Sequence, residues 1–315
     1  MDDLLPQRYP NQDFFVADIM DAAPKDDLAG MEHPMFSLAK QPDRDSRSYK
    51  HNGISVEIFP SHLGLPTIWD KDILIYCISQ LMAGINLGRE PSKTLRITTH
   101  DLLVSTNRPI GGTHYGRVKE ALTRLRGSQI ITDIKTNGEE SEGFGFIDRW
   151  KAVKRSKDDS TMIAIEVTLS DWLYRAVLGA EVLTINRDYF RLRGGLERRL
   201  YELARKHCGN QSRWPIGIEL LHKKSGAKSS LKSFRARIKK VVDANVLPDY
   251  RMKLDITKDQ LIFYNRTGSK AAKAEFDDGM RKLFAPEYPN QKRRRSVSTR
   301  RTTSQVSLDL DMPLS

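Results

Sequence analysis

The stretch IELLHKKSGAKSSLKSFRARIKKVVDANVLPDYRMKLDITKDQLIFY, residues 218–264, contains two helical patterns followed by two alternating ones. Ser229 or Ser230 can serve as the N-cap of the longer helix, whose apolar side chains recur at helical spacing: Leu231, Phe234, Ile238, Val241 and Val242. Apolar and polar residues then alternate over 252–257, and 261–264 returns after a turn, which predicts a β-hairpin. Short helix, turn, longer helix and hairpin are the elements of a winged helix, in which the longer helix enters the DNA major groove.

The longer helix and the turn before it are strongly basic. Residues 223–240 contain eight Lys and Arg side chains and no acid. Four of these bases recur at i, i+4, i+7 and i+11, so they share a face that is separate from the apolar stripe. We predict that this unit contacts DNA through Lys228, Ser230, Lys232, Arg235 and Lys239, with Arg able to pair with guanine edges.

The same order of elements occurs earlier in the chain. The expected elements are a helix over 70–85, a strand over 95–99, a short helix over 100–105, a turn at 109–112, a basic helix over 115–127, and strands over 130–134, 144–153 and 162–168. We predict that the basic helix contacts DNA through Thr113, His114, Tyr115, Arg117 and Arg124. The hairpin would hold phosphates through Lys151, Lys154 and Lys157.

These patterns predict an α+β protein with two tandem winged-helix domains, at 46–180 and 181–268. Residues 1–45 hold ten acids and four bases and lack sustained periodicity, so we expect a flexible acidic N-terminal arm. Residues 269–315 end in a basic stretch rich in Ser and Thr, which predicts a disordered basic C-terminal tail.

Composition narrows the class of protein. The 315 residues carry 52 Lys and Arg against 40 Asp and Glu, a net charge of +12 that favours a polyanionic partner. Two cysteines cannot form a disulfide framework, and no apolar run approaches the roughly 18 residues that a membrane span needs. The N-terminal sequence lacks the pattern of a secretory signal. We therefore expect a cytoplasmic protein with no membrane partner.

Motifs for catalysis are missing from the sequence. No Gly-x-x-x-x-Gly-Lys-Ser/Thr stretch offers a phosphate-binding loop for ATP, and the seven histidines include no His-x-His pair for a metal. We expect no cofactor, no metal and no enzymatic activity. A DNA-cleaving relaxase is the alternative from another class, and the absence of a nick in supercoiled plasmid would exclude it.

Five stretches of the chain resemble the replication initiator protein A family of bacterial plasmids. They are FFVADIMDAAPKDDLAGMEHPMFSL at 14–38, LPTIWDKDILIYCISQL at 65–81, RPIGGTHYGRVKEALTRLRGSQI at 108–130, LRGGLERRLYELARKHCG at 192–209 and SLKSFRARIKKVVDANVLPDYRMKL at 230–254. The resemblance covers about residues 10–265. It implies a protein that binds repeated sequences in its own plasmid origin and recruits the host replication machinery.

The wider class of tandem winged-helix initiators adds further expectations. In that class, monomers open the origin and dimers repress their own promoter, so the resemblance implies a homodimer, and a host initiator and the replicative helicase as partners. The alternative is a winged-helix transcription repressor without initiator activity. Replication of a plasmid that carries only this gene and its origin would exclude that alternative.

A short segment near the C-terminus carries a separate signal. Residues 305–310 read QVSLDL and resemble the linear motif by which bacterial polymerases bind the sliding clamp. We predict clamp contacts by Gln305, Leu308 and Leu310, since a glutamine amide and two spaced leucines suit a groove with one polar subsite.

Overall fold

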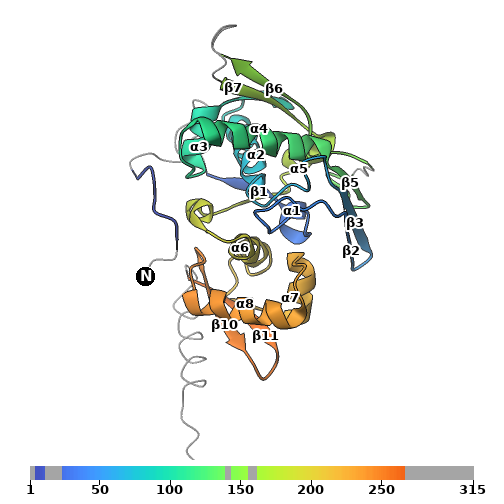
Figure 1. Cartoon of the computed structure of the whole chain (residues 1–315), viewed down its shortest axis with the longest axis vertical. Coiled ribbons are helices and arrows are strands. Elements are labelled where there is room, and N and C mark those ends of the chain that lie inside the picture. Colours follow the sequence, from blue (N-terminus) through green and yellow to red (C-terminus); the bar gives the residue numbers. More distant parts are fainter. Residues whose placement is uncertain (1–3, 11–22, 139–142, 155–161, 267–315) are drawn as a thin grey trace, which may run out of the picture. The chain divides into compact units, whose positions relative to one another are not determined.

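A long apolar helix lies at the centre of the first half of the chain (Figure 1). The computed structural model describes residues 4–10, 23–138, 143–154 and 162–266. Within them, α2 (Lys71–Asn86) buries most of its first three turns. Thr67 and Asp70 cap each other at its start, with Asp70 N donating to Thr67 Oγ1 at 3.2 Å and Thr67 N to Asp70 Oδ2 at 2.8 Å. The helix predicted over 70–85 is confirmed.

A three-stranded sheet and two further helices surround α2. They are β4 (Thr94–Thr98), α3 (Thr99–Ser105), α4 (Gly112–Gly127), β6 (Ile147–Lys154) and β7 (Met162–Leu169), and the antiparallel sheet has the order β4-β7-β6. Thr98 caps α3 by accepting from Asp101 N at 3.1 Å. The basic helix α4 buries Val118, Leu122 and Leu125. The predicted order of helices and strands is therefore present.

A second sheet has the order β2-β3-β5 and consists of β2 (Arg47–His51), β3 (Ile54–Phe59) and β5 (Gln129–Thr132). The strand predicted over 130–134 pairs with β3 and lies in a different sheet from the β6–β7 hairpin. Strand β2 carries no apolar alternation that would predict it, because its residues RSYKH place only Tyr49 in the core.

The second half repeats the order of a strand, two helices and a hairpin, and the strands of its hairpin are shorter. It contains α6 (Gly195–His207), β9 (Arg213–Gly217), α7 (Ile218–Ser225), α8 (Leu231–Ala244), β10 (Tyr250–Asp255) and β11 (Gln260–Asn265). The antiparallel sheet has the order β10-β11-β9. The chain between the halves forms α5 (Asp171–Leu178), β8 (Val182–Thr184) and the 3-10 helix η1 (Arg187–Arg191).

The prediction of a flexible acidic arm at 1–45 is wrong for residues 25–38. Residues 25–27 form β1 (Lys25–Asp27), which pairs with β8, and α1 (Leu28–Glu32) follows at once. Met31 and Met35 are buried in the core. The acids of this segment are partners of buried bases that lie far away in the sequence, so composition alone does not reveal their place.

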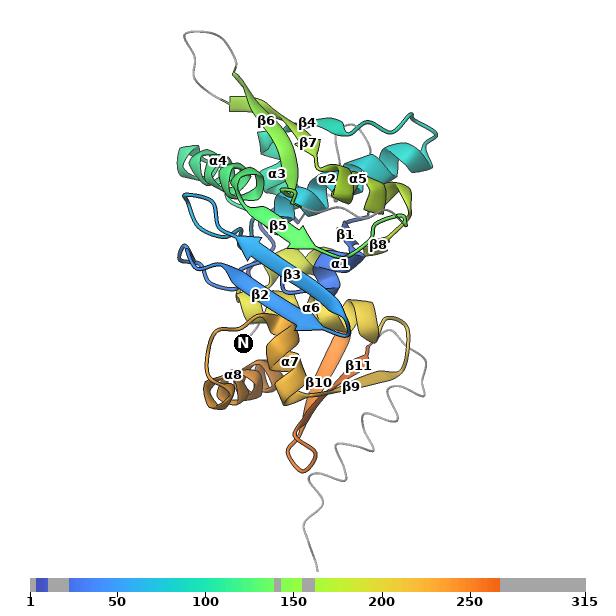
Figure 2. The ribbon, with the colours of Figure 1, turned by 90° about the vertical axis from the view of Figure 1, so that its right-hand side faces the viewer.

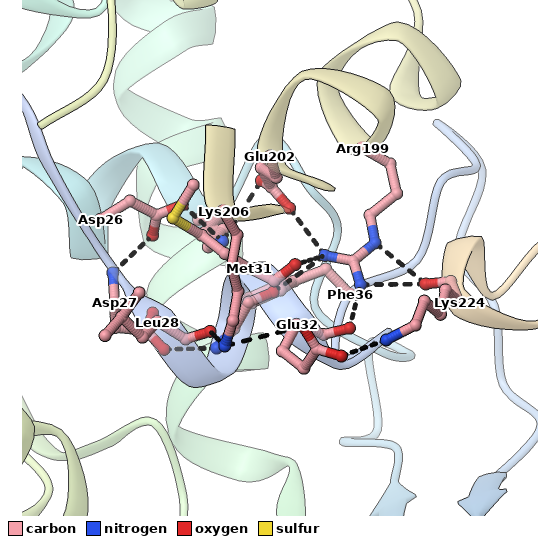
Figure 3. A network of polar contacts seen from close by, with 12 residues as sticks. Asp26, Asp27, Leu28, Met31, Glu32, Phe36, Arg199, Glu202, Lys206 and Lys224 are labelled. Carbon is pink, nitrogen blue, oxygen red and sulfur yellow. Dashed lines mark hydrogen bonds and ion pairs between the residues drawn. The ribbon is translucent and has the colours of Figure 1, made fainter. Parts of the chain in front are cut away.

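A buried ionic network joins β1, α2 and α6 (Figure 3). Lys71 is fully buried, and its Nζ lies 2.7 Å from Asp26 Oδ2 and 3.2 Å from Glu202 Oε1. Arg199 donates to Glu202 Oε2 at 3.0 Å and to the carbonyl oxygens of Gly30 and Met31, also at 3.0 Å. Burial alone would lower the pKa of Lys71, but the carboxylates of Asp26 and Glu202 raise it above its ordinary value. Lys71 therefore remains charged inside the fold.

A second buried group ties α2 to α6. Asp72 accepts from Arg198 at 2.6 Å and from Arg108 at 2.8 Å. Arg198 and Arg199 are only 3% exposed, although their place on an amphipathic basic helix suggests a solvated face.

In the described ranges, no helix combines the length and the apolar character that crossing a bilayer requires.

Candidate nucleic-acid interface

Helix α8 is positioned by its cap, its apolar stripe and its C-terminal turn. Ser230 accepts from Ser233 N at 3.3 Å, while Phe234 and Ile238 are completely buried. The helix ends at Asn245, which adopts a left-handed φ of 48° and accepts from Met252 N at 3.1 Å. These contacts fix which face of α8 meets solvent.

The solvent face of α8 is basic. Five basic side chains are exposed on it, and no acid lies between the first and the last of them: Lys232, Arg235, Arg237, Lys239 and Lys240. Lys232, Arg235 and Lys239 follow one another at steps of three and four residues, so they form one row along the helix. Of the predicted set, Ser230 serves as the N-cap and also donates to Ser233 Oγ at 3.1 Å.

Arg235 connects α8 to the turn of the β10–β11 hairpin. Its Nε donates to Asp259 Oδ1 at 3.0 Å, and its Nη2 donates to Oδ2 at 2.6 Å. The hydrogen bonds lower the pKa of Asp259 and raise that of Arg235 relative to their ordinary values. Both side chains remain about half exposed, so the pair lies at the surface where α8 and the hairpin meet.

Lys228 is held by the N-terminal segment. Its Nζ lies 2.6 Å from Asp43 Oδ1 and 2.8 Å from Asp45 Oδ2. Asp43 also accepts from Arg47 at 2.9 Å. A residue that the sequence assigned to DNA is thus paired with acids that the sequence assigned to a flexible arm.

In the first half, the residues at the start of α4 that are predicted to contact DNA differ in their exposure to solvent. Thr113 and Arg117 are exposed, whereas His114 is half-buried and Tyr115 packs against the core. Partial burial and the nearby charges of Arg117, Arg108 and Arg8 lower the pKa of His114. The same surroundings therefore favour the neutral form of this imidazole.

Arg124 forms an ion pair within the fold that the sequence pattern does not indicate. Its Nε and Nη2 donate to the two carboxylate oxygens of Asp70 at 2.7 and 2.9 Å, and its side chain is 13% exposed. This bidentate pair joins α4 to the start of α2, so we leave Arg124 out of the proposed DNA-contact set.

The remaining predicted residues lie at the edge of what the structure describes. Lys151 is exposed on β6, 3.9 Å from Glu166. The side chain of Lys154 lies outside the described residues, as do Lys157 and the predicted clamp motif of Gln305, Leu308 and Leu310.

Sequence reasoning missed two features of this interface. One is the pairing of Asp259 with Arg235: a carboxylate at a hairpin turn beside a basic helix is a candidate partner for that helix. Ile256, in the same turn, is 82% exposed. Within the part of the chain that the structure describes, no three His, Cys, Asp or Glu side chains gather as a metal site.

Solved structures with a similar fold are domains 2 and 3 of RctB. A selenomethionine crystal structure of these domains matches with a TM-score of 0.54 and 12% identity, covering 73% of this chain and 94% of that one. A second structure of the same domains has a TM-score of 0.50 and 10% identity, covering 77% of this chain and 97% of that one. At this level of identity the likeness concerns the fold alone.

Sequence comparisons identify the family. A "Putative replication protein" of Wigglesworthia glossinidia brevipalpis is 39% identical over 259 residues, which cover 81% of this chain and 94% of that protein. The family model described as Replication initiator protein A matches residues 25–252. The matched range extends from β1 to β10 and includes both halves of the fold together with the N-terminal segment that joins them. The chain belongs to the replication initiator protein A family.

Proposed function

We propose that this protein starts plasmid replication by binding repeated origin sequences with two winged-helix units, one in each half of the chain. Helices α8 and α4 would each enter a major groove, which at about 12 Å is wide enough for a helix. The hairpins β10–β11 and β6–β7 would lie against the flanking backbone. Units on one face of B-DNA would meet grooves roughly 34–36 Å apart.

The topology of the two sheets supports the winged-helix interpretation. In the second half, β9 precedes the two helices and pairs with the second strand of the hairpin that follows them. In the first half, β4 does the same with β7. The sequences of the halves are not obviously alike, so this agreement in strand pairing is independent of any sequence repeat.

The exposed basic row of α8 is the observation that carries the proposal. Lys232, Arg235 and Lys239 are exposed and share one face, and the stretch from 232 to 240 contains no acid. Cations in this arrangement release counterions from the phosphate backbone and supply the affinity that base contacts then make selective. The proposed contacts of the first unit are Thr113, His114, Tyr115 and Arg117, together with Lys151, Lys154 and Lys157 of its hairpin.

Replication would then follow from binding and recruitment, without catalysis by this chain. Duplex opening would draw on the bending energy of DNA and on host proteins. We propose a host initiator, the replicative helicase and the sliding clamp as partners, the last through Gln305, Leu308 and Leu310. Dimers would repress the protein's own promoter. A winged-helix repressor without initiator activity is the alternative.

Binding to DNA that flanks the gene tests the role of α8. Replacing Lys232 and Lys239 together by Ala should weaken binding to all duplexes and reduce the slope of log K against log salt by about one per lost phosphate contact. Lys50→Ala is the control, because Lys50 is also exposed but lies on β2, outside both helix-hairpin units. Unchanged binding by the double variant would refute the placement of α8.

A replication assay separates initiator from repressor. A plasmid that carries only this gene and the flanking DNA should replicate in a host that lacks other plasmid initiators. If the protein binds the DNA but the plasmid is lost, the repressor alternative is favoured. Nicking of supercoiled plasmid by the purified protein with a divalent metal would instead indicate a relaxase.

A further inference from the structure

The turn of the β10–β11 hairpin displays an isoleucine to solvent. Ile256 is 82% exposed, the highest exposed fraction among the large apolar side chains that the structure describes as exposed. Four-residue turns of this kind are usually built from Gly, Pro, Asn, Asp and Ser, which satisfy the backbone without presenting apolar surface. A β-branched aliphatic side chain at this place contributes nothing to the core, so its apolar surface is free to contact a partner.

The turn is held in a defined position. Lys258 N donates to Asp255 Oδ1 at 3.1 Å, and Asp259 adopts a left-handed φ of 48°. Asp259 accepts three hydrogen bonds: its backbone oxygen accepts one from Ile218 N at 2.9 Å, and its carboxylate accepts two from Arg235 of α8. The tip that carries Ile256 is therefore fixed to the first residue of α7 and to the second turn of α8, so the tip does not have to become ordered on binding.

The surroundings of Ile256 favour DNA over an apolar protein surface. Lys258 follows it by two residues and is exposed, and the basic row of α8 lies on the helix to which the turn is tied. The other exposed large apolar residues come from other elements: Phe59, Leu87, Ile110, Ile131 and Leu178. Two acids also lie in this turn, but Asp255 accepts from Lys258 N and Asp259 is paired with Arg235. A single aliphatic side chain is too small for a stable protein interface but has the form of a DNA wedge.

The position of the hairpin turn also suits such a wedge. In both ribbon views the β10–β11 turn extends past α8 (Figures 1 and 2). With α8 in a major groove, a turn that projects beyond the helix would point toward the neighbouring phosphate strand and the minor groove beyond it.

We propose that Ile256 enters the minor groove beside the α8 site and unstacks one base step. This inference rests on the proposed DNA binding by α8 and adds a source of duplex deformation. Apolar side chains such as Ile, Leu and Phe unstack and kink base steps when they are inserted from the minor groove. The local opening would come from a preformed protrusion and would require no nucleotide hydrolysis.

Site-specific fluorescence tests the wedge. 2-Aminopurine is placed in turn at each step of the duplex flanking the α8 footprint, and its fluorescence reports unstacking. The full-length protein should raise the signal several-fold at one step. Ile256→Ala and Ile256→Ser should return that step to the level of free DNA while keeping affinity within about tenfold, and Ile256→Leu should retain the signal.

Two control variants isolate the effect. Thr257→Ala alters the neighbouring exposed turn residue, and Leu87→Ala removes an exposed aliphatic side chain that follows α2. Both should leave the fluorescence unchanged. Because Ile256 is exposed, its variants should have the circular dichroism and melting temperature of the wild type.

The outcomes separate the wedge from the proposed function. If the protein binds and no step brightens, or if the Ile256 variants brighten it equally, the wedge is refuted and DNA binding stands. If the wild-type protein binds no flanking duplex, or if the Lys232 and Lys239 double variant binds as well as wild type, the proposed function fails and the wedge fails with it.

Discussion

At Arg235, a single guanidinium serves both the helix and the hairpin. Its Nε and one Nη2 hydrogen are used by Asp259, which leaves Nη1 for DNA. We expect Arg235→Ala and Asp259→Ala each to weaken binding and relax discrimination at one base pair, by about 1–3 kcal/mol for the arginine. The double variant should be no worse than Arg235→Ala alone, because the two residues act as one unit.

Competition binding with base-substituted sites measures this coupling. Additive losses in the double variant would show that the residues act independently. The melting temperature should stay that of the wild type in Arg235→Ala, since the pair is exposed, and should fall slightly where Ala replaces Asp259, whose left-handed φ of 48° disfavours Ala.

His33 predicts a dependence of stability on pH. Burial lowers the pKa of His33 from its usual 6.5 to about 4, with Lys206, Arg199 and Lys224 acting in the same direction and Glu32 opposing them. Below pH 6.5, His33 is therefore protonated in the unfolded chain but stays neutral in the folded protein. Stability is full above that pH and should fall by about 2 kcal/mol between pH 7.5 and 5.

Denaturant unfolding at the two pH values measures the loss, and His33→Gln should flatten it. Burial would raise the pKa of Glu32, but His207 and Lys224 hold it below its ordinary 4.5, so its own contribution is lost only in more acidic solution. An equally steep pH dependence in the His33 variant would contradict this assignment.

At the scale of elements, the segment before β2 limits the basic surface near α8. Asp45 is exposed and holds Lys228 together with Asp43. Asp45→Asn should free Lys228 in part and raise DNA affinity about two- to fivefold at low salt, with the gain shrinking as salt screens the charges. Titrations at two salt concentrations check this. Lys228→Ala in the same background should cancel the gain, and a gain that persists would assign it to another contact.

Elements whose pattern lies within one stretch of chain could be predicted from sequence. Helices α2 and α8 and both hairpins carry their apolar periodicity in consecutive residues. The strand β1 and helix α1 could not be predicted, because acids such as Asp26 make sense only beside Lys71, 45 residues later. For the same reason the sequence predicts a DNA contact for Arg124, because its partner Asp70 lies 54 residues away. Long-range charge pairing leaves no local periodicity.

At the scale of the whole described fold, Lys71 joins three parts of the chain. It contacts Asp26 of β1 and Glu202 of α6 from its own place in α2. Lys71→Ala would leave two buried carboxylates without their shared cation, and we expect a loss of about 3–5 kcal/mol in unfolding free energy. Unfolding should remain a single transition, because the network spans both halves.

Chemical denaturation followed by circular dichroism and tryptophan fluorescence measures both properties. Lys50→Ala, on the exposed face of β2, is the control and should change stability little. Two separate transitions in the wild type, with only one shifted by Lys71→Ala, would show that the halves fold independently.

The burial of Arg198 and Arg199 has a consequence for the geometry of the DNA target. Arg198 is paired with Asp72 of α2, and Arg199 donates to the carbonyl oxygens of Gly30 and Met31. A shift of α6 against the first half would leave both buried guanidinium groups without these partners. If both units read DNA as proposed, a molecule built in this way would tolerate only one helical phase between their target sequences. Inserting about five base pairs, half of a B-DNA turn, between those sequences should abolish simultaneous binding by the two units. Inserting about ten base pairs should restore the helical phase, but the two sequences would then be one turn too far apart for one molecule to span.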